Sequence, residues 1–460
     1  MSLIKSISGI RGTIGGVVGD NLTPIDTVKF ASAYGSWLKK RNSSNLKVVV
    51  GRDARISGPI IQSLVQSCLQ SLGIDIIDLA LTTTPTVEIA VPLENASGGI
   101  ILTASHNPKE WNALKLLNEK GEFISALDGE EILSIAEKED FIFSQVDKLG
   151  SMVSKNYMEK HLEMVLSLSN VNIDLVKSAS FKVVVDAVNS SGGIYLPALL
   201  RKMGVDVVEL HCTPNGHFPH NPEPLPEHLN DLCELVVSSA SDLGFVVDPD
   251  VDRLAIVCED GSLFGEEYTL VAVADHVLKT KKGDTVSNLS STRALKDVSD
   301  KHGVNYHASA VGEVNVVEKM KEVNSPIGGE GNGGIIYPEL HYGRDSLVGV
   351  ALFLTHLAES KMICSDLRKI YTNYFMTKQK IQINPGTDVD YILAKLSNIH
   401  IDEQLDLSDG VKINFSQEWV HLRKSNTEPI IRVYTESTSQ EKADQLAEKF
   451  MQEIKSLVLS

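Results

Sequence analysis

The chain has 460 residues, of which 42% are hydrophobic and 22% are charged, as in ordinary soluble globular proteins. This length exceeds what one hydrophobic core usually supports, so we expect roughly two to four domains. The formal net charge of -17 argues against nucleic acid and anionic membranes as partners, because both require a basic surface on the protein.

The N-terminal part carries two basic segments that are rich in glycine. In the first, SISGIRGTIGG at residues 6–16, we interpret Arg11 as a residue that faces an anionic site. The second, GRDARISG, follows at residues 51–58. Its charged side chains fit either an anion site or an ordinary ion-paired loop, and they are Arg52, Asp53 and Arg55.

One pattern of elements occurs three times along the chain. Residues 46–80 and 181–210 each predict a buried strand, a polar loop, an amphipathic helix and a second strand, and residues 283–311 repeat this more weakly. The β-branched strands indicate sheets covered on both faces, with right-handed connections between strands. Each helix is followed by a glycine suited to a left-handed C-cap, namely Gly73, Gly204 and Gly303. We expect three α/β domains of similar design, for which an internal triplication is plausible.

An apolar strand at residues 99–102 ends at the polar sequence TASHNP, which contains Ser105 and His106. Ser105 could be a nucleophile of the Ser–His hydrolase type. However, a Gly-x-Ser-x-Gly elbow is missing, and a histidine directly after a serine is seldom placed to deprotonate it. Lys115 stands in the apolar run that follows. It fits the outer face of a strand or, if it points into a cleft, an acid/base group whose pKa is lowered by burial.

Another apolar strand ends at the acidic sequence DPDVDR, which sets carboxylates at Asp248, Asp250 and Asp252. Three such carboxylates repel one another unless a cation lies among them, and hard oxygen ligands suit Mg²⁺ or Ca²⁺. An EF-hand is excluded because Arg253 stands where that loop needs a glycine, and because the flanking segments are strands. A solvated acidic turn is the alternative interpretation.

Two later loops are candidate ligand sites. In IGGEGNGGIIYP, five glycines surround Glu330 and Asn332, whose side chains could hydrogen-bond to sugar hydroxyls, with a flexible turn as the alternative. In VHLRKSNTEP, a guanidinium, two hydroxyls and an amide lie in one turn and could bind a phosphate dianion. These four residues are Arg423, Ser425, Asn426 and Thr427. A polar hairpin turn would have a similar composition.

The C-terminal part differs from the three repeats. Strand-like segments there alternate with a helix near residues 389–399, and an amphipathic helix follows at residues 440–459. This order predicts a small α+β domain with an antiparallel sheet. We place the four domains at residues 1–155, 156–262, 263–371 and 372–460.

Taken in order, TASHNP, DPDVDR, the GGE loop and RKSNTEP resemble the motifs of the α-D-phosphohexomutase family over essentially the whole chain. The resemblance implies three related α/β domains and a smaller α+β domain around a central cleft. It also implies an isomerase that moves phosphate between the 6- and 1-positions of a hexose phosphate through a phosphoserine and a hexose 1,6-bisphosphate. Glucosamine 6-phosphate is the first-choice substrate. The alternatives are phosphoglucomutase/phosphomannomutase activity and, more remotely, a sugar-phosphate phosphatase or a non-catalytic sensor.

The same resemblance implies catalytic roles for single residues. Ser105 matches the serine that carries the phosphoryl group, and Mg²⁺ would lie between its phosphate and the three aspartates. Lys115 matches the lysine proposed as acid/base. The residues that would steady the phosphoryl group are Arg11, His106 and Arg253.

Substrate-binding roles follow in the same way. Glu330 and Asn332 match the positions that bind the hydroxyls of the sugar, and the loop from Arg423 to Thr427 matches the grip on the phosphate that does not react. One position departs from the family, because many members have a histidine where this chain has Gly334. Nearby His341 is a candidate to replace that histidine.

The remaining expectations concern location and assembly. The N-terminus lacks a signal peptide, and no apolar run reaches membrane-spanning length. The five cysteines are scattered without zinc-ligand spacing, which is typical of small buried side chains in a reducing compartment. We expect a cytoplasmic monomer or homodimer whose ligands are hexose phosphates.

Overall fold

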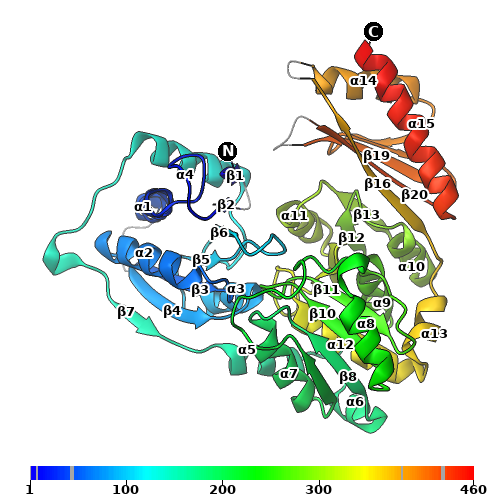
Figure 1. Ribbon diagram of the computed structural model, residues 1–460, viewed down its shortest axis with the longest axis horizontal. Helices are drawn as coiled ribbons and strands as arrows, with labels where there is room; N and C mark the ends of the chain where they lie inside the picture. The colour runs from blue at the N-terminus through cyan, green and yellow to red at the C-terminus, as the bar shows by residue number, and fades with distance from the viewer. Residues whose placement is uncertain (1, 7–8, 42–45, 385–386, 426–429, 460) are drawn as a thin grey trace.

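The computed structural model describes residues 2–6, 9–41, 46–384, 387–425 and 430–459. These residues form four β-sheets with their own helices, three mixed sheets followed by an antiparallel one (Figure 1). The predicted architecture of three α/β units and a C-terminal α+β unit is therefore confirmed. Among the described helices, none has the combination of length and apolar character that crossing a membrane requires.

The first unit is built on a seven-stranded sheet with the order β1-β2-β6-β5-β3-β4-β7. Its strands are β1 (Ile4–Ser6), β2 (Gly9–Thr13), β3 (Lys47–Arg52), β4 (Asp75–Leu81), β5 (Gly98–Leu102), β6 (Trp111–Leu117) and β7 (Met152–Ser154). Its helices are α1 (Pro24–Arg41), α2 (Gly58–Ser71), α3 (Thr84–Leu93) and α4 (Ala126–Lys138). Val48 and Val50 pack into one hydrophobic cluster and Val49 into another, which confirms that β3 is buried on both faces.

The second and third units each have a four-stranded sheet. The second contains β8 (Lys182–Asp186), β9 (Asp206–Leu210), β10 (Leu243–Val247) and β11 (Leu254–Cys258), with α5 (Met158–Leu166), α6 (Ile173–Ala179), α7 (Gly192–Lys202) and α8 (Asn230–Ser238). The third contains β12 (Thr285–Asn288), β13 (Tyr306–Ser309), β14 (Ile327–Glu330) and β15 (Gly334–Ile336), with α9 (Glu266–Leu278), α10 (Ala294–His302), α11 (Glu313–Val323), α12 (Ser346–Ser360) and α13 (Cys364–Lys369).

The same strand order occurs in all three units: β6-β5-β3-β4, β11-β10-β8-β9 and β15-β14-β12-β13. In each, three strands are parallel, and a fourth returns antiparallel beside the third. This repetition supports the internal triplication. The loop between the third and fourth strands contains Ser105 in the first unit and Asp248 in the second, and in the third unit Glu330 is the strand residue that directly precedes it. The three candidate site loops are therefore equivalent in topology.

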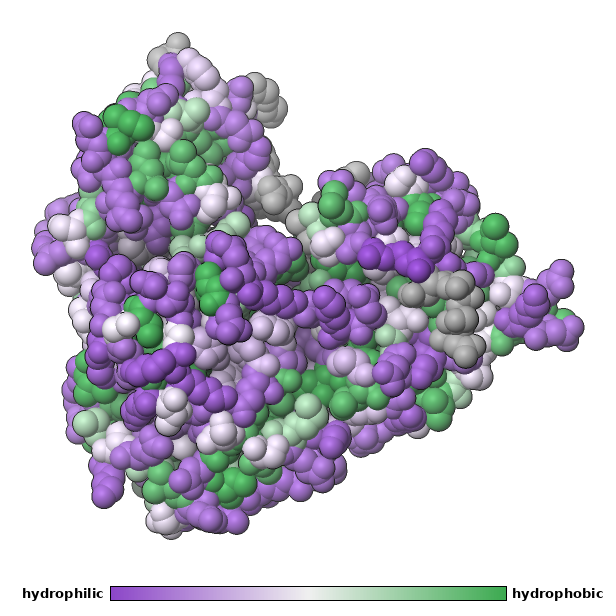
Figure 2. Space-filling view, turned by 180° about the vertical axis from the view of Figure 1, so that it is seen from behind, coloured by the Kyte–Doolittle hydropathy of each residue, from purple (hydrophilic) through white to green (hydrophobic). Residues whose placement is uncertain are grey.

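The C-terminal unit has a five-stranded antiparallel sheet with the order β16-β20-β19-β18-β17. Its strands are β16 (Phe375–Gln382), β17 (Gln404–Asp406), β18 (Val411–Asn414), β19 (Trp419–Lys424) and β20 (Ile430–Ser437), and its helices are α14 (Val389–Ile399) and α15 (Gln440–Leu459). It lies against the third unit and apart from the first (Figure 1). The surface is hollowed between the C-terminal and N-terminal units (Figure 2).

Candidate active site

Ser105 lies just beyond the end of β5 in left-handed backbone, with φ at 49°. A non-glycine residue in this region is uncommon, and such strain is typical of functional turns. Its amide donates to Thr103 Oγ1 at 2.9 Å, and Thr103 Oγ1 donates to Asp53 Oδ2 at 2.7 Å. The Ser105 hydroxyl donates to Asp248 Oδ2 over 2.7 Å, and His106 Nδ1 lies 3.3 Å from the same hydroxyl.

Arg55 is buried beneath the Ser105 loop and holds it in place. Its Nε donates to Asp53 Oδ2 at 3.0 Å, so the ion-paired interpretation holds for Arg55 and Asp53, whereas Arg52 donates to uncharged oxygen atoms. Its two terminal nitrogens donate over 2.5–3.0 Å to four main-chain oxygens, those of Ser105, Asn107, Pro108 and Trp111. The ion pair therefore belongs to the candidate site as a support for the serine, a role that the sequence did not reveal.

The three aspartates between β10 and β11 are completely buried, with oxygen atoms that lie within 4.8 Å of one another. Asp248 Oδ1 accepts from the amides of Asp252 and Arg253, each at 3.1 Å, and Asp250 Oδ2 accepts from Thr84 Oγ1 at 2.6 Å. Burial and the two neighbouring carboxylates raise the pKa of Asp248 well above its ordinary value. The second oxygens of Asp250 and Asp252 are buried without a hydrogen-bond partner, which suits a bound cation.

Two buried cationic side chains pair with Asp250 and Asp252. Lys115 Nζ donates to Asp250 Oδ2 at 2.7 Å and lies 3.5 Å from Asp252 Oδ2, and Arg344 Nη2 donates to Asp252 Oδ2 at 2.8 Å. Burial acts to lower the pKa of Lys115, but Asp250 and Asp252 act more strongly together, so that its pKa is raised. The expectation of a lowered pKa is therefore wrong, because the sequence does not show which carboxylates face the lysine.

Arg344 also connects the acidic loop with the glycine-rich loop of the third unit. Its Nη1 donates to Glu330 Oε2 at 2.7 Å and its Nε to Glu313 Oε2 at 3.0 Å. Glu330 is buried, and its Oε1 accepts from Asn288 Nδ2 at 2.8 Å. A Cβ atom on Gly334 would lie 2.3 Å from Arg344 Cδ. The space beside Gly334 is thus filled by Arg344, a residue that no sequence motif indicated.

His341 and Asn332 both contact polar groups of the protein. His341 Nδ1 lies 3.3 Å from Glu88 Oε2, and its Nε2 lies 3.3 Å from Asp345 Oδ2. Asn332 Oδ1 accepts from the amide of Gly334 at 3.2 Å, within its own loop. The structure therefore gives His341 two carboxylate partners outside the acidic loop, and the space beside Gly334 is occupied by Arg344 rather than by His341.

The other basic candidates gather around the Ser105 loop. Arg11 Nη1 donates to Asn107 Oδ1 at 2.7 Å. Arg253 Nη1 lies 3.5 Å from Glu223 Oε1, and His106 Nε2 lies 4.0 Å from the same oxygen. Burial, with the charges of Arg253 and Arg11, lowers the pKa of His106 well below its ordinary value. Glu223, which no sequence motif indicated, is a carboxylate that pairs with Arg253 and lies near His106.

The predicted phosphate grip lies in the C-terminal unit. Arg423 Nε is 3.3 Å from Asp409 Oδ2, and the Ser425 amide donates to the main-chain oxygen of Ile430 at 3.0 Å. Asn426 and Thr427 lie outside the described residues. The described part of this loop thus belongs to a different sheet from Ser105, on the unit that stands apart from the first in Figure 1.

Three repeated α/β units with a serine, three aspartates and a glutamate on equivalent loops define a phosphohexomutase, an enzyme that isomerises hexose phosphates. Family models described as phosphoglucomutase/phosphomannomutase match almost the whole chain. The alpha/beta/alpha domains I, II and III match residues 4–143, 156–261 and 265–374, and the C-terminal domain matches residues 376–453. The chain belongs to this family.

Individual relatives agree with this assignment. A phosphoglucomutase/phosphomannomutase of Thermococcus kodakarensis is 34% identical, with 95% of this chain and 96% of the relative covered. A probable phosphoglucosamine mutase of Methanopyrus kandleri is 31% identical, with 96% of each chain covered. The crystal structure of a phosphoglucomutase/phosphomannomutase family protein from Burkholderia thailandensis has a TM-score of 0.85 at 25% identity and covers 99% of this chain and 98% of that chain. The predicted family and class of enzyme are confirmed.

Proposed function

We propose that the protein interconverts the 6-phosphate and 1-phosphate of a hexose, with Ser105 as the carrier of the phosphoryl group. The observation that carries this proposal is the 2.7 Å hydrogen bond from Ser105 Oγ to Asp248 Oδ2. It places a hydroxyl on a strained turn at the edge of three buried carboxylates. Such a site meets the main needs of phosphoryl transfer, which are positioning and neutralisation of charge.

In the proposed cycle, phosphorylated Ser105 donates its phosphoryl group to a free hydroxyl of the hexose monophosphate. The bond between phosphorus and Ser105 Oγ breaks as the bond to the sugar oxygen forms, and the proton of that hydroxyl ends on Ser105 Oγ. Lys115 is our candidate for the relay of this proton. The hexose 1,6-bisphosphate then reorients, and its other phosphoryl group returns to Ser105. Arg11, His106 and Arg253 would steady the group in transit.

We propose Mg²⁺ as the metal of the acidic loop. The unpartnered oxygens of Asp250 and Asp252 support this, because Mg²⁺ prefers hard oxygen ligands. Asp248 and Ser105, through the phosphoryl group that it carries, would complete the ligands. When bound, the ion would supply positive charge to stabilise the phosphoryl group in the transition state.

The four domains proposed at residues 1–155, 156–262, 263–371 and 372–460 would each contribute one loop. The loop with Glu330 and Asn332 would bind the hydroxyls of the sugar. The loop with Arg423, Ser425, Asn426 and Thr427 would hold the phosphate that does not react.

Glucosamine 6-phosphate is our first choice of substrate, and glucose and mannose phosphates are the second. Relatives named for both activities each cover almost the whole chain, which supports both choices. Assays of the purified enzyme on the phosphates of glucosamine, glucose and mannose distinguish the two hypotheses. If the glucosamine ester is the poorest of the three substrates, the first choice fails.

The phosphoserine is tested by intact-mass spectrometry and by turnover of Ser105→Ala. We expect this variant to lose a covalent phosphate that the wild type carries and to lose activity at least about a thousandfold. Ser63→Ala, at an exposed serine on α2, is the matched control and should keep both. Substantial turnover by Ser105→Ala would overturn the mechanism. Steady release of inorganic phosphate without isomerisation would favour a phosphatase instead.

A further inference from the structure

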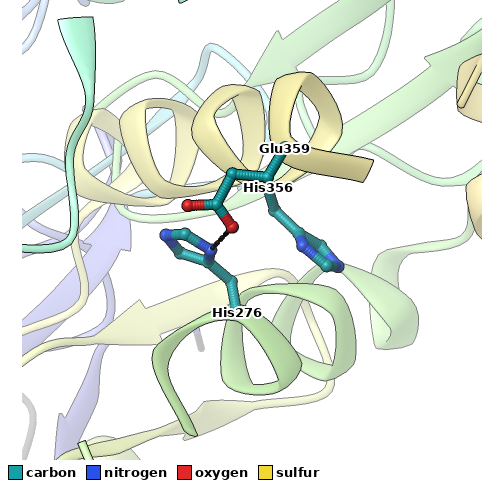
Figure 3. A group of neighbouring side chains, drawn as sticks. All are labelled: His276, His356 and Glu359. Carbon is teal, nitrogen blue, oxygen red and sulfur yellow. Dashed lines mark ion pairs between the residues drawn. The ribbon is translucent and has the colours of Figure 1, made fainter. Parts of the chain in front are cut away.

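Two histidines and a glutamate meet where α9 and α12 end (Figure 3). His276 comes from α9, and His356 and Glu359 come from α12, with one possible ligand atom of each within 4.8 Å of the others. Both helices begin near the acidic loop, because the amide of Ser346 in α12 donates to the main-chain oxygen of Val251 and the hydroxyl of Thr269 in α9 donates to that of Leu254, each at 3.1 Å. Ten residues of helix span about 15 Å, so this cluster is separate from the candidate active site.

His276 has an unsatisfied nitrogen that points at a carboxylate. Its Nε2 lies 2.8 Å from the main-chain oxygen of Asn170, an acceptor only, which assigns the ring proton to Nε2 and a lone pair to Nδ1. Nδ1 is buried without a hydrogen-bond partner and lies 3.3 Å from Glu359 Oε2 (Figure 3). Two electron-pair donors at this distance repel each other unless a cation or a proton lies between them.

His356 is oriented in the same way. Its Nε2 lies 2.9 Å from the hydroxyl of Tyr371, which donates its own proton to Asp275 Oδ2, so the ring proton again lies on Nε2. His356 Nδ1 accepts from Lys279 Nζ at 3.1 Å, and this ammonium is 3.3 Å from Glu359 Oε2. The ammonium of Lys279 therefore already bridges His356 and Glu359, whereas His276 Nδ1 has no cation beside it among the contacts of the described residues.

We propose that His276 Nδ1, His356 Nδ1 and Glu359 bind a divalent transition-metal ion of the zinc type, in place of the ammonium of Lys279. Imidazole nitrogens and a carboxylate are ligands that suit zinc. Ligand atoms of a tetrahedral zinc site lie about 3.3 Å apart, the separation already found between His276 Nδ1 and Glu359 Oε2.

Two further features of the cluster support the proposal. Each imidazole has its second nitrogen held by an oxygen atom, which is how metal-binding histidines are usually oriented. The side chain of Lys279 is 40% exposed, so it can move into solvent when a metal ion takes its place. Glu359 is 37% exposed, so it can adjust to the geometry of the ion.

Zinc binding to the full-length protein, measured by equilibrium dialysis with excess Mg²⁺ to compete at the acidic loop, tests the proposal. We expect one zinc ion per chain at this cluster. Glu359→Gln should weaken its binding at least about tenfold. Glu322→Gln is the matched control, because Glu322 is also an exposed helical glutamate paired with a lysine, and it should bind zinc like the wild type.

We expect Lys279→Met to change the affinity for zinc in the opposite direction. Because the ammonium competes with the metal ion, its removal should tighten zinc binding several-fold, which loss of a merely structural contact would not do. The proposal is overturned if Glu359→Gln binds zinc as well as the wild type, or if Lys279→Met binds it no more tightly. These measurements do not depend on activity, so they stand apart from the test of Ser105.

Discussion

Arg55 gives four hydrogen bonds to main-chain oxygens of the loop that carries Ser105. A lysine cannot replace them, because its ammonium is a single point of charge without the planar fork of a guanidinium. We expect Arg55→Lys to lower the free energy of unfolding by about 3 kcal/mol. We also expect it to lower kcat, since the Ser105 hydroxyl would no longer be held against Asp248. Urea unfolding and steady-state assays measure the two effects.

Arg52 provides the control for this substitution. It is partly buried in the same segment, but it donates to Gln62 Oε1 and to the main-chain oxygen of Asp53 rather than to the serine loop. Arg52→Lys should cost less than about 1 kcal/mol and leave kcat unchanged. Equal effects of the two substitutions would contradict a positioning role for Arg55.

Because Gly334 has no side chain, Arg344 can occupy the space beside it. A Cβ atom there would lie 2.3 Å from Arg344 Cδ, and the guanidinium is held by three carboxylates. We expect Gly334→Ala to lower the free energy of unfolding by about 1–3 kcal/mol, as overpacked substitutions do. Gly334→His should lower the free energy of unfolding further, and it should not increase activity.

Gly58, the first residue of α2, is the matched control for the alanine substitution. The nearest atom to a Cβ there is Arg52 Cδ, 3.0 Å away in a side chain that is only partly buried. Gly58→Ala should change stability by no more than about 1 kcal/mol. A stable and more active Gly334→His enzyme, compared by urea unfolding and assay, would show that Arg344 does not exclude the histidine.

The reactive residues could be selected from the sequence, but their partners could not. Ser105 and the aspartates stand in distinctive motifs at the ends of apolar strands. Arg344 is a single arginine in an unremarkable segment, and the carboxylates that it binds come from three other parts of the chain. The direction of the pKa shift of Lys115 likewise depends on Asp250 and Asp252, which are remote in sequence.

The N-terminus of α12 depends on a buried cap at Asp345. Its Oδ1 accepts from the amide of Leu347 at 2.8 Å, and its Oδ2 is 2.8 Å from His161 Nε2. Asp345→Ala should lower the free energy of unfolding by about 2–4 kcal/mol. About 1 kcal/mol of this loss is expected from the cap, and the rest from the contacts of Asp345 Oδ2 with His161 and His341.

Asp388, the exposed cap of α14, is a control that distinguishes the contribution of a helix cap from that of a histidine contact. Its side chain accepts from the amide of Tyr391 at 3.0 Å, and no histidine depends on it among the contacts of the described residues. Asp388→Ala should therefore cost only about 1 kcal/mol in urea unfolding. Similar losses at both caps would mean that the contacts of Asp345 with His161 and His341 contribute nothing.

The repeated elements could be predicted because each leaves a local signal. Runs of β-branched residues indicated the central strands, and Gly73, Gly204 and Gly303 do adopt left-handed backbone after their helices. Strands of three residues, such as β1 and β7, were not predicted because they are too short for a pattern. The equivalence of the three site loops depends on strand order, which is set by pairing between distant segments.

The position of the C-terminal unit depends on contacts that no local pattern predicts. Lys412 Nζ donates to the main-chain oxygen of Leu289 at 2.7 Å, and the hydroxyl of Ser290 lies 2.9 Å from His421 Nδ1. These contacts join the C-terminal sheet to the loop after β12. The sequence indicated a fourth domain of the correct class, but the surface by which it attaches required the structure.

His421 makes this attachment sensitive to acid. Its other nitrogen, Nε2, donates to the main-chain oxygen of Asp409 at 2.7 Å. Burial lowers its pKa to about 4, and the charges of Lys412 and Arg423 add to this effect while Asp409 opposes it. The unfolded chain takes up this proton near pH 6.5, whereas the folded protein takes it up only near pH 4. The stabilisation is therefore complete above pH 6.5 and is lost as the pH falls towards 4.

We expect the wild type to lose on the order of 2 kcal/mol of unfolding free energy between about pH 6.5 and pH 4.5 through this residue alone. His421→Gln should lose less over this interval, because an amide can keep both hydrogen bonds without taking up a proton. Urea unfolding of the two proteins at several pH values measures the difference. His217→Gln, at an exposed histidine, controls for the loss of one imidazole. If the unfolding free energies of the wild type and His421→Gln fall equally as the pH is lowered, protonation of His421 does not weaken the contact between the third and C-terminal units.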